Sequence, residues 1–188
     1  MKPALHTPVI KVKDLQFRLF ISESEIKAAI RNMAAQINSD LAGEHPVFLP
    51  VLNGAFLFAA DLMREITIPN HISFIKIASW EGTQSSGTVK SLIGAGKELK
   101  GKTVVVLEDI VDTGTSLENI VEELKNIGVN RILVACLLFK PEAYKKNLKI
   151  DYVGIQVPNV FLLGYGLDYD QEGRNLKDIY QIQNNNHV

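Results

Sequence analysis

The sequence has a single cysteine, no apolar run long enough to cross a bilayer and almost no excess of charge of either sign. One cysteine excludes an intramolecular disulfide and a zinc site built from several cysteines. Cys136 lies within the apolar run of residues 132–138, which predicts a small residue of the core. The absence of a long apolar run predicts a protein without a transmembrane helix.

The charges nearly cancel, with 20 Lys and Arg against 21 Asp and Glu and a formal net charge of -1. This balance argues against a broad surface for nucleic acid or anionic membrane, which needs clustered cations, but leaves a local basic site open. The first six residues lack the apolar stretch of a secretory signal. We therefore expect a cytoplasmic protein that binds neither nucleic acid nor membrane. No internal repeat or Pro/Ser-rich linker divides residues 1–188, which predicts one domain.

Periodic apolar residues predict alternating strands and helices. Ser22 and Glu25 have the spacing of a capping box, and the apolar positions that follow predict a helix. Strands are predicted over residues 47–52, 72–79, 103–107, 131–138, 152–155 and 160–163. Further helices are predicted up to residue 63 and from a cap at Thr115 or Ser116 to a stop at Gly128. Residues 80–102 are rich in Gly, Ser, Thr and Lys, and are predicted to form a long loop outside the core.

This alternation is typical of a doubly wound α/β sheet. Residues 103–107 are continuously apolar and β-branched apart from their last leucine, as expected for a central parallel strand covered on both faces. Ligands of such sheets bind beyond the carboxyl ends of the strands. We therefore expect the chemistry at Asn53, at residues 109–116 and at Lys140.

The most informative segment follows that central strand. Glu108 and Asp109 are succeeded by Asp112 and by the small, hydroxyl-rich turn of residues 113–116. Backbone N–H groups, hydroxyls and a helix N-terminus suit a phosphate monoester. Carboxylates beside an anion site make sense if the ligand is a phosphorylated sugar, whose hydroxyls they hold directly or through Mg²⁺. The segment lacks the Gly-Lys-Ser/Thr of a Walker A loop and is not a Gly-x-Gly-x-x-Gly dinucleotide turn.

Residues 107–116 resemble the phosphoribosyl-diphosphate signature of the type I phosphoribosyltransferase family, and the chain most resembles its hypoxanthine-guanine branch. The resemblance extends from about residue 47 to residue 180. It implies a doubly wound, mostly parallel sheet with flanking helices, plus a small base-binding hood formed by the N-terminal segment and roughly residues 152–188. It also implies a homodimer or homotetramer. The implied reaction is purine salvage. It is a Mg²⁺-dependent transfer of 5-phosphoribosyl from its diphosphate to N9 of hypoxanthine or guanine, giving IMP or GMP and pyrophosphate.

The resemblance implies a pyrophosphate-binding turn at Leu52, Asn53 and Gly54, with a cis peptide between the first two. The family typically has Lys or Arg in place of Asn53, so this chain keeps the backbone and loses a charge. Read alone, Asn-Gly is an ordinary turn. Ser79 and Trp80 resemble the start of a catalytic lid, in which the family usually has Tyr in place of Trp80.

In the acidic segment, the resemblance assigns ribose hydroxyls and metal to Glu108 and Asp109, and N7 of the purine to Asp112 as the catalytic group. It assigns binding of the 5-phosphate to the next four residues, Thr113, Gly114, Thr115 and Ser116. Many relatives have Lys in place of Thr115, so this phosphate site is less cationic than theirs.

The remaining implied site residues lie in the C-terminal third. Lys140 would donate to the purine 6-oxo group, Phe161 would stack on the base, and the backbone of Leu162 would contact its edge. Asp168 would bind metal and Arg174 the departing pyrophosphate. Without the resemblance, a lysine at a strand end is more often a solvated charge, and Phe161 is more often a packing residue.

Two alternative functions are considered, one of a different class of protein and one for a different substrate. A regulator with this fold that senses nucleotide or binds RNA would be expected to lose Asp112 or the lid and to gain a basic face. A related enzyme for xanthine is not excluded by Lys140 and Phe161. The sequence also leaves open the preference between hypoxanthine and guanine.

Overall fold

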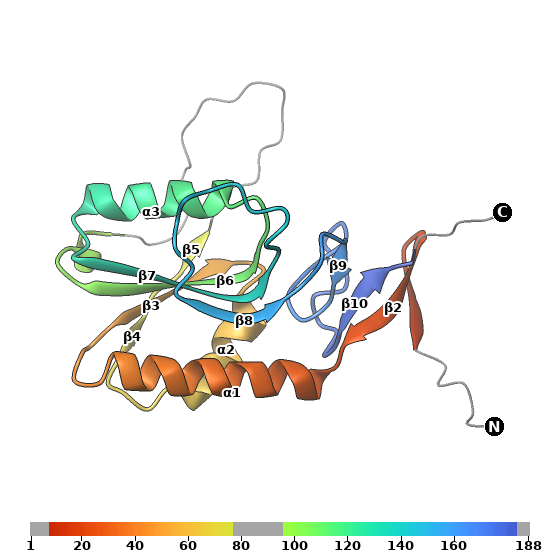
Figure 1. The fold of residues 1–188 in the computed structure, drawn as a ribbon, viewed down its shortest axis with the longest axis horizontal. Coiled ribbons are helices and arrows are strands. Elements are labelled where there is room, and N and C mark those ends of the chain that lie inside the picture. Colours follow the sequence, from red (N-terminus) through yellow and green to blue (C-terminus); the bar gives the residue numbers. More distant parts are fainter. Residues whose placement is uncertain (1–7, 77–95, 184–188) are drawn as a thin grey trace, which may run out of the picture.

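A parallel six-stranded sheet runs through the centre of the protein, with helices on both of its faces (Figure 1). The computed structural model describes residues 8–76 and 96–183. Within this sheet the strand order is β4-β3-β6-β7-β8, and β5 also pairs with β3. The strands are β3 (Val47–Leu52), β4 (His71–Ile72), β5 (Ile75–Lys76), β6 (Thr103–Val111), β7 (Arg131–Phe139) and β8 (Tyr152–Gln156).

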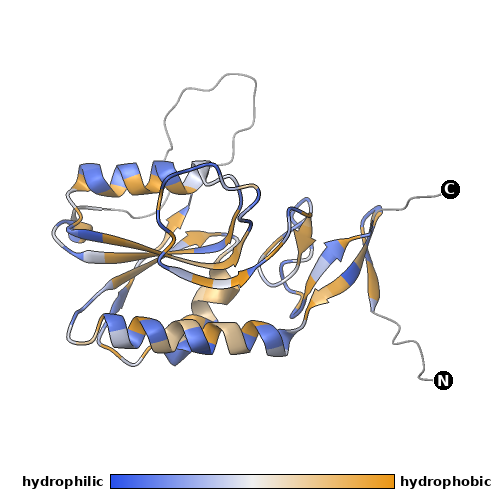
Figure 2. Ribbon diagram, viewed as in Figure 1, coloured by the Kyte–Doolittle hydropathy of each residue, from blue (hydrophilic) through white to orange (hydrophobic). Residues whose placement is uncertain are grey.

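The helices form the outer layers of this domain. Helices α1 (Glu23–Asp40) and α2 (Phe56–Glu65) cover one face of the sheet, and α3 (Thr115–Ile127) covers the other (Figure 1). Figure 2 shows α1 and α3 as amphipathic helices and the strands between them as mostly apolar. Strand β6 contributes side chains to the apolar cores on both faces of the sheet, since Val105 packs on the α1 side and Val104 on the α3 side. The predicted doubly wound α/β fold is confirmed.

Local signals explain how these helices begin and end. The Ser22–Glu25 capping box is present, since each residue's side chain accepts a hydrogen bond from the other's backbone N–H. Gly128 ends α3 in the left-handed conformation (φ 87°), as predicted. The start of α3 differs from the prediction: Gly114 (φ 84°) is the N-cap, and Thr115 is already helical. A hydroxyl cap was expected, but a glycine that reverses the backbone begins this helix instead.

A smaller antiparallel sheet joins the two ends of the described chain. Its order is β1-β2-β10-β9, and its core contains Phe17, Leu163 and Tyr180. Its strands are β1 (Val9–Val12), β2 (Leu15–Ile21), β9 (Leu162–Leu163) and β10 (Ile179–Ile182). The boundary at residue 152 given for the hood is wrong, because β8 pairs in parallel with β7 and belongs to the large sheet.

Three element boundaries also differ from the sequence predictions. The strand predicted over residues 72–79 is two short strands, β4 and β5, and residues 77–79 lie outside the described part of the chain. The strand predicted over 160–163 is reduced to β9. In the stretch expected to be outside the core, the 3-10 helix Lys97–Leu99 buries the Leu99 side chain in the cluster beneath α3. Hydrophobic burial of one leucine outweighs the polarity of its neighbours.

The helices of the described ranges are each too short or too polar to span a bilayer.

Candidate active site

Two chain segments meet where β3 and β6 end at the same edge of the large sheet. The turn after β3 contains a cis peptide between Leu52 and Asn53, as predicted, and the Asn53 side chain is exposed. Gly54 lies directly against Asp109 of β6, because a Cβ added to Gly54 would fall 1.8 Å from Asp109 Oδ2. Only a residue without a side chain fits between this turn and the carboxylate.

Glu108 and Asp109 lie inside β6, which runs four residues further than the predicted end at Leu107. Burial raises the pKa of Glu108 well above its usual range, and the neighbouring charge of Asp109 adds to the effect. Burial also raises the pKa of Asp109 to about 6, although backbone N–H groups and Arg174 oppose the shift. Ionised carboxylates are costly in such surroundings, so this pair attracts a positively charged ligand.

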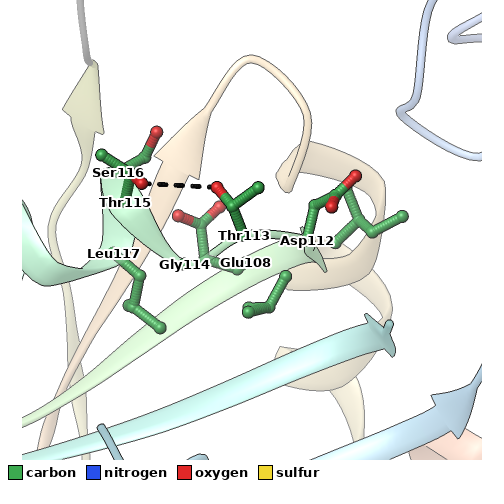
Figure 3. A pocket seen from close by; sticks show the side chains of 9 residues that line it. Glu108, Asp112, Thr113, Gly114, Thr115, Ser116 and Leu117 are labelled. Atoms are coloured by element: carbon green, nitrogen blue, oxygen red, sulfur yellow. Dashed lines mark hydrogen bonds between the residues drawn. The ribbon is translucent and has the colours of Figure 1, made fainter. Parts of the chain in front are cut away.

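The turn of residues 113–116 borders a pocket at the start of α3. The pocket lining also includes Glu108 and Asp112, and Figure 3 shows the Thr113 and Thr115 hydroxyls facing each other, Oγ1 to Oγ1 at 3.4 Å. Among the described residues, no side chain caps the N-terminus of α3. The first N–H groups of α3 therefore have no intrahelical acceptor, and together with the hydroxyls they suit an anion.

Asp112 and Lys140 form an ion pair beside this pocket, with Lys140 Nζ 2.8 Å from Asp112 Oδ2. Lys140 is buried at 7% exposure, while the Asp112 side chain is 46% exposed. A lysine at a strand end is more often solvated, but here it is one of the few buried charged residues of the described chain. The structure thus brings together the two residues assigned to the purine ring.

A third segment, from the loop after β9, packs against the turn at Gly54. A Cβ on Gly166 would lie 2.0 Å from the carbonyl oxygen of Gly54. Arg174 donates through Nη1 to the Gly166 carbonyl oxygen at 2.8 Å and pairs through Nη2 with Asp168 at 2.7 Å. The charges of Arg174 and Asp168 both affect the pKa of Asp109. These five residues therefore belong to one cluster around the end of β6.

Leu162 begins strand β9 of the smaller sheet, and Phe161 directly precedes it. The Phe161 side chain is 44% exposed, and its ring lies 6.2 Å from that of Phe17 and 6.0 Å from that of Tyr169. Leu162 is buried and pairs with Gln181 in β10. An exposed aromatic ring supported by two others suits a flat ligand.

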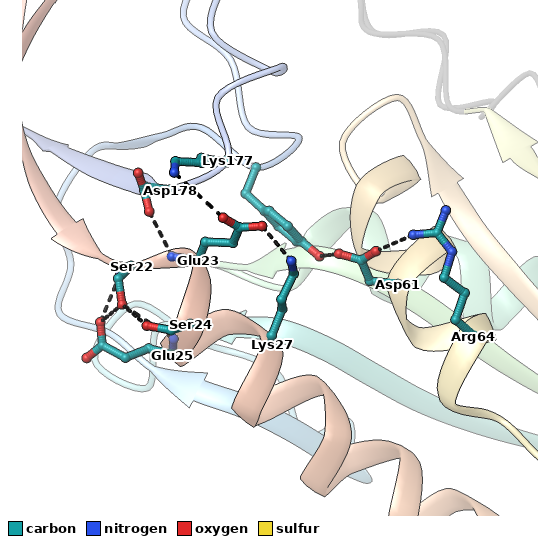
Figure 4. A network of polar contacts seen from close by, with 10 residues as sticks. Ser22, Glu23, Ser24, Glu25, Lys27, Asp61, Arg64, Lys177 and Asp178 are labelled. Carbon is teal, nitrogen blue, oxygen red and sulfur yellow. Dashed lines mark hydrogen bonds and ion pairs between the residues drawn. The ribbon is translucent and has the colours of Figure 1, made fainter.

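The sequence reading missed a buried tyrosine that holds the third segment in place. Tyr165 has a left-handed backbone (φ 50°), and its hydroxyl donates to Asp61 Oδ2 of α2 at 2.6 Å. Asp61 also pairs with Arg64 of the same helix at 2.9 Å (Figure 4). The Gly-Tyr-Gly pattern at 164–166 was a signal for an unusual backbone, but nothing in the sequence identifies Asp61 as the partner.

Two predicted site residues, Ser79 and Trp80, lie outside the described residues. Within the described ranges, no group of three or more His, Cys, Asp or Glu side chains is arranged to hold a metal ion by itself. A metal bound by Asp168 or by Glu108 and Asp109 would therefore share its coordination with a ligand, as Mg²⁺ commonly does with phosphates.

The carboxyl edge of this parallel α/β sheet thus combines a hydroxyl-rich turn at a helix N-terminus with the carboxylates of Glu108, Asp109 and Asp112, and doubly wound α/β proteins bind their ligands at such an edge. Comparison with known proteins gives the family. The model of the phosphoribosyl transferase domain matches residues 22–170, and the chain belongs to the phosphoribosyltransferase family.

Relatives of known name cover nearly the same length. The chain is 34% identical over 176 residues to a hypoxanthine-guanine phosphoribosyltransferase of Aquifex aeolicus, which covers 92% of this chain and 98% of the relative. It is 38% identical over 165 residues to one of Staphylococcus epidermidis, covering 87% and 92% respectively. The structure is similar to that of a hypoxanthine phosphoribosyltransferase from Staphylococcus aureus, with TM-score 0.82, 34% identity and coverage of 88% and 91%.

Proposed function

We propose that the protein is a purine salvage enzyme that transfers 5-phosphoribosyl from phosphoribosyl diphosphate to N9 of hypoxanthine or guanine. The products are the purine mononucleotide and pyrophosphate. The observation that carries this proposal is the Asp112–Lys140 ion pair beside the pocket of residues 113–116, because such a pair suits the polar edge of a 6-oxopurine and the turn suits a phosphate. The named relatives, at 34–38% identity over most of the chain, support the same reaction.

The donor fits the acidic edge of the sheet. The turn at Thr113–Ser116 holds the 5-phosphate through its N–H groups and hydroxyls. Glu108 and Asp109 take the ribose hydroxyls, and the backbone of Asn53 and Gly54 takes the pyrophosphate. Arg174, already beside Gly54 through Gly166, meets the leaving group.

The chemistry of the site fits Mg²⁺. Its candidate ligands are the hard carboxylate oxygens of Glu108, Asp109 and Asp168, and burial raises the pKa of the first two. A divalent cation would offset both this carboxylate charge and that of the departing pyrophosphate. Carboxylates next to the sugar also stabilise positive charge that develops at its C1 as the bond to pyrophosphate breaks.

The base fits between the larger and the smaller sheet. Lys140 Nζ donates to the 6-oxo group, and Asp112 accepts the N7 proton as the C1–N9 bond makes it acidic. Phe161 stacks on the purine, and the backbone of Leu162 contacts its edge. Adenine would place a 6-amino donor against the Lys140 donor, so it is disfavoured.

The test is an assay of the purified full chain with Mg²⁺, phosphoribosyl diphosphate and hypoxanthine, guanine, xanthine or adenine in turn. We expect mononucleotide from hypoxanthine or guanine, with the ratio of their kcat/KM values settling the preference between them. No product from any 6-oxopurine would refute the function, and turnover of adenine alone would refute the role of Lys140.

A second test addresses the catalytic group. Asp112→Asn removes the proton acceptor and keeps the shape, so we expect kcat to fall about 10²–10⁴-fold while KM for the donor changes little. Steady-state kinetics in both substrates separate these parameters. An unchanged kcat would show that Asp112 takes no part in proton transfer.

We further propose that the enzyme acts in the cytoplasm as a homodimer or homotetramer. For a Trypanosoma cruzi relative at 32% identity, the C-terminal region is known to bear on oligomeric state and activity. Sedimentation of the full chain, with and without residues 184–188, tests whether the same is true here.

A further inference from the structure

The pocket beside the turn of residues 113–116 is rich in negative charge. Two carboxylates, Glu108 and Asp112, belong to its lining, and the described lining residues include neither lysine nor arginine. A phosphate monoester brings close to two further negative charges at neutral pH. A cation that reaches the turn from a neighbouring segment would therefore strengthen phosphate binding considerably.

The segment of residues 140–148, which follows β7, is docked on this turn. The Lys140 N–H donates to the Val111 carbonyl oxygen at 3.0 Å, just before the turn, and the Lys145 N–H donates to the Thr113 carbonyl oxygen at 3.3 Å. These backbone bonds fix the path of the segment relative to the turn, and they bring the residue after Lys145 alongside it.

That residue is Lys146, whose aliphatic stem lies against Gly114. A Cβ added to Gly114 would meet Lys146 Cγ at 3.0 Å and Tyr144 Cε2 at 2.4 Å. The ammonium group of a lysine lies three single bonds of about 1.5 Å each beyond Cγ. Lys146 Nζ can therefore reach a phosphate held by the N–H groups of the turn, since the stem is flexible and starts beside it.

In the structure, Lys146 Nζ is paired with Glu118 Oε2 at 2.5 Å, in the first turn of α3. The two side chains are 26% and 50% exposed. A pair this exposed contributes little to stability, so a dianionic phosphate competes well for the same ammonium group.

We infer that Lys146 is the cation that binds the 5-phosphate of the phosphoribosyl group, and that Glu118 holds it beside the turn until the phosphate takes its place. This inference rests on the proposed function, because it assigns the phosphate of that reaction to this turn. Lys146 lies outside the acidic signature, six residues after Lys140 in the same segment.

Isothermal titration of the full chain with inosine monophosphate and, separately, with pyrophosphate tests it. The first ligand carries the 5-phosphate, whereas the second belongs to the turn at Gly54. For Lys146→Met we expect Kd for inosine monophosphate to rise about tenfold. Kd for pyrophosphate should stay within about twofold of the wild-type value.

Lys149→Met is the matched control. Lys149 lies in the same part of the chain and is also ion-paired, with Asp151 at 2.8 Å, but its side chain is 83% exposed. Both Kd values of this variant should equal those of the wild type.

The other outcomes overturn the inference. An unchanged Kd for inosine monophosphate in Lys146→Met would mean that Lys146 does not touch the phosphate. An equal loss for both ligands would mean that the residue only supports the fold. If the wild-type chain binds neither ligand, the proposed function itself has failed. This result is distinct from the two outcomes for Lys146→Met.

Glu118→Gln tests the competition separately. It removes the charge that holds Lys146, so we expect inosine monophosphate to bind about two- to threefold more tightly. An unchanged Kd would show that Glu118 does not compete with the phosphate.

Discussion

At the scale of single residues, the two neighbouring acids of β6, Glu108 and Asp109, dominate the electrostatics of the site. Glu108 is 7% exposed, and the carboxyl group of Asp109 lies directly against Gly54. Burial raises the pKa of both groups. Ionising these groups therefore carries an electrostatic cost at the edge of the sheet, and a cation bound beside them would relieve that cost.

Because ionising Asp109 is costly, we predict that Asp109→Asn raises the free energy of unfolding by an amount that depends on pH. The folded-state pKa of about 6 is raised from 3.8, so the folded protein binds this proton more tightly than the unfolded chain does. The free energy of unfolding of the wild type therefore falls as pH rises from about 4 to about 6, because Asp109 loses its proton over this range. The variant should be more stable than the wild type by up to about 3 kcal/mol near neutral pH.

Thermal unfolding of both proteins across this pH range, without substrate or metal, provides the measurement. The advantage of the variant should grow from about pH 4 to about pH 6 and then level off. An advantage that is constant with pH would contradict a buried, titrating Asp109.

The residues with a chemical signature could be predicted from the sequence, whereas those defined by a distant partner could not. Carboxylates, hydroxyls and a lysine at strand ends pointed to Asp109, to Asp112 with residues 113–116, and to Lys140. Lys146 and Tyr165 gave no such signal. Their roles depend on Glu118 and on Asp61, which lie 28 and 104 residues away in the chain.

At the scale of elements, the site depends on a backbone contact between two turns that are far apart in sequence. Gly166 (φ 99°) packs on the carbonyl oxygen of Gly54, and Gly54 packs on Asp109. A side chain at Gly166 would displace backbone atoms, which cannot yield as a flexible side chain does.

Gly166→Ala should therefore damage the site more than its backbone strain alone explains. Gly43→Ala is the control, because Gly43 also has a positive φ (82°) but has nothing within 4 Å of an added Cβ. Both variants should lose about 1–2 kcal/mol of stability from the left-handed conformation. Only Gly166→Ala should also raise KM for phosphoribosyl diphosphate, by about tenfold or more, since a misplaced turn weakens pyrophosphate binding.

Equal KM values for the two alanine variants would show that the contact between Gly166 and Gly54 does not shape the pyrophosphate turn. Denaturant unfolding and donor-dependent kinetics, measured on the same preparations, separate the effects on stability and on binding.

Element boundaries were predictable where a local rule decides them. The Ser22–Glu25 capping box and Gly128 mark the ends of two helices as expected. The end of β6 was not predictable, because its acidic residues read as a loop, yet the ladder with β7 continues to Val111. Tertiary pairing overrides local polarity there.

At the scale of the whole molecule, polar contacts join the smaller sheet to the helical layer of the domain. In Figure 4, the Glu23 backbone N–H donates to Asp178 at 2.8 Å, and the Glu23 carboxylate pairs with Lys27 and Lys177. Tyr165 also donates to Asp61 of α2 at 2.6 Å. These contacts join the chain between β9 and β10 to helices α1 and α2.

Tyr165→Phe should weaken this connection. Tyr152→Phe is the matched control, because Tyr152 is equally buried and its hydroxyl also bonds an aspartate, Asp40, at 3.2 Å. Each change should cost about 1 kcal/mol and lower Tm by about 2–4 °C. Only Tyr165→Phe should also raise KM for the donor, because Tyr165 directly precedes Gly166. Unaltered donor kinetics in Tyr165→Phe would contradict its positioning role.

The large sheet could be predicted from the sequence because parallel strands buried on both faces are continuously apolar. The smaller sheet could not be outlined, because β2, which pairs with β1, also pairs with β10 from the opposite end of the chain. Short, half-exposed strands of this kind give a weak periodic signal, and long-range pairing leaves no local pattern.

In the proposed reaction, one site joins a 6-oxopurine to the phosphoribosyl group and releases pyrophosphate. The most direct measurement is the ratio of pyrophosphate released to mononucleotide formed, followed with hypoxanthine, phosphoribosyl diphosphate and Mg²⁺. We predict one pyrophosphate for each mononucleotide, and no release when the base or Mg²⁺ is left out. Pyrophosphate released without a base, or none released with hypoxanthine and guanine alike, would contradict this account.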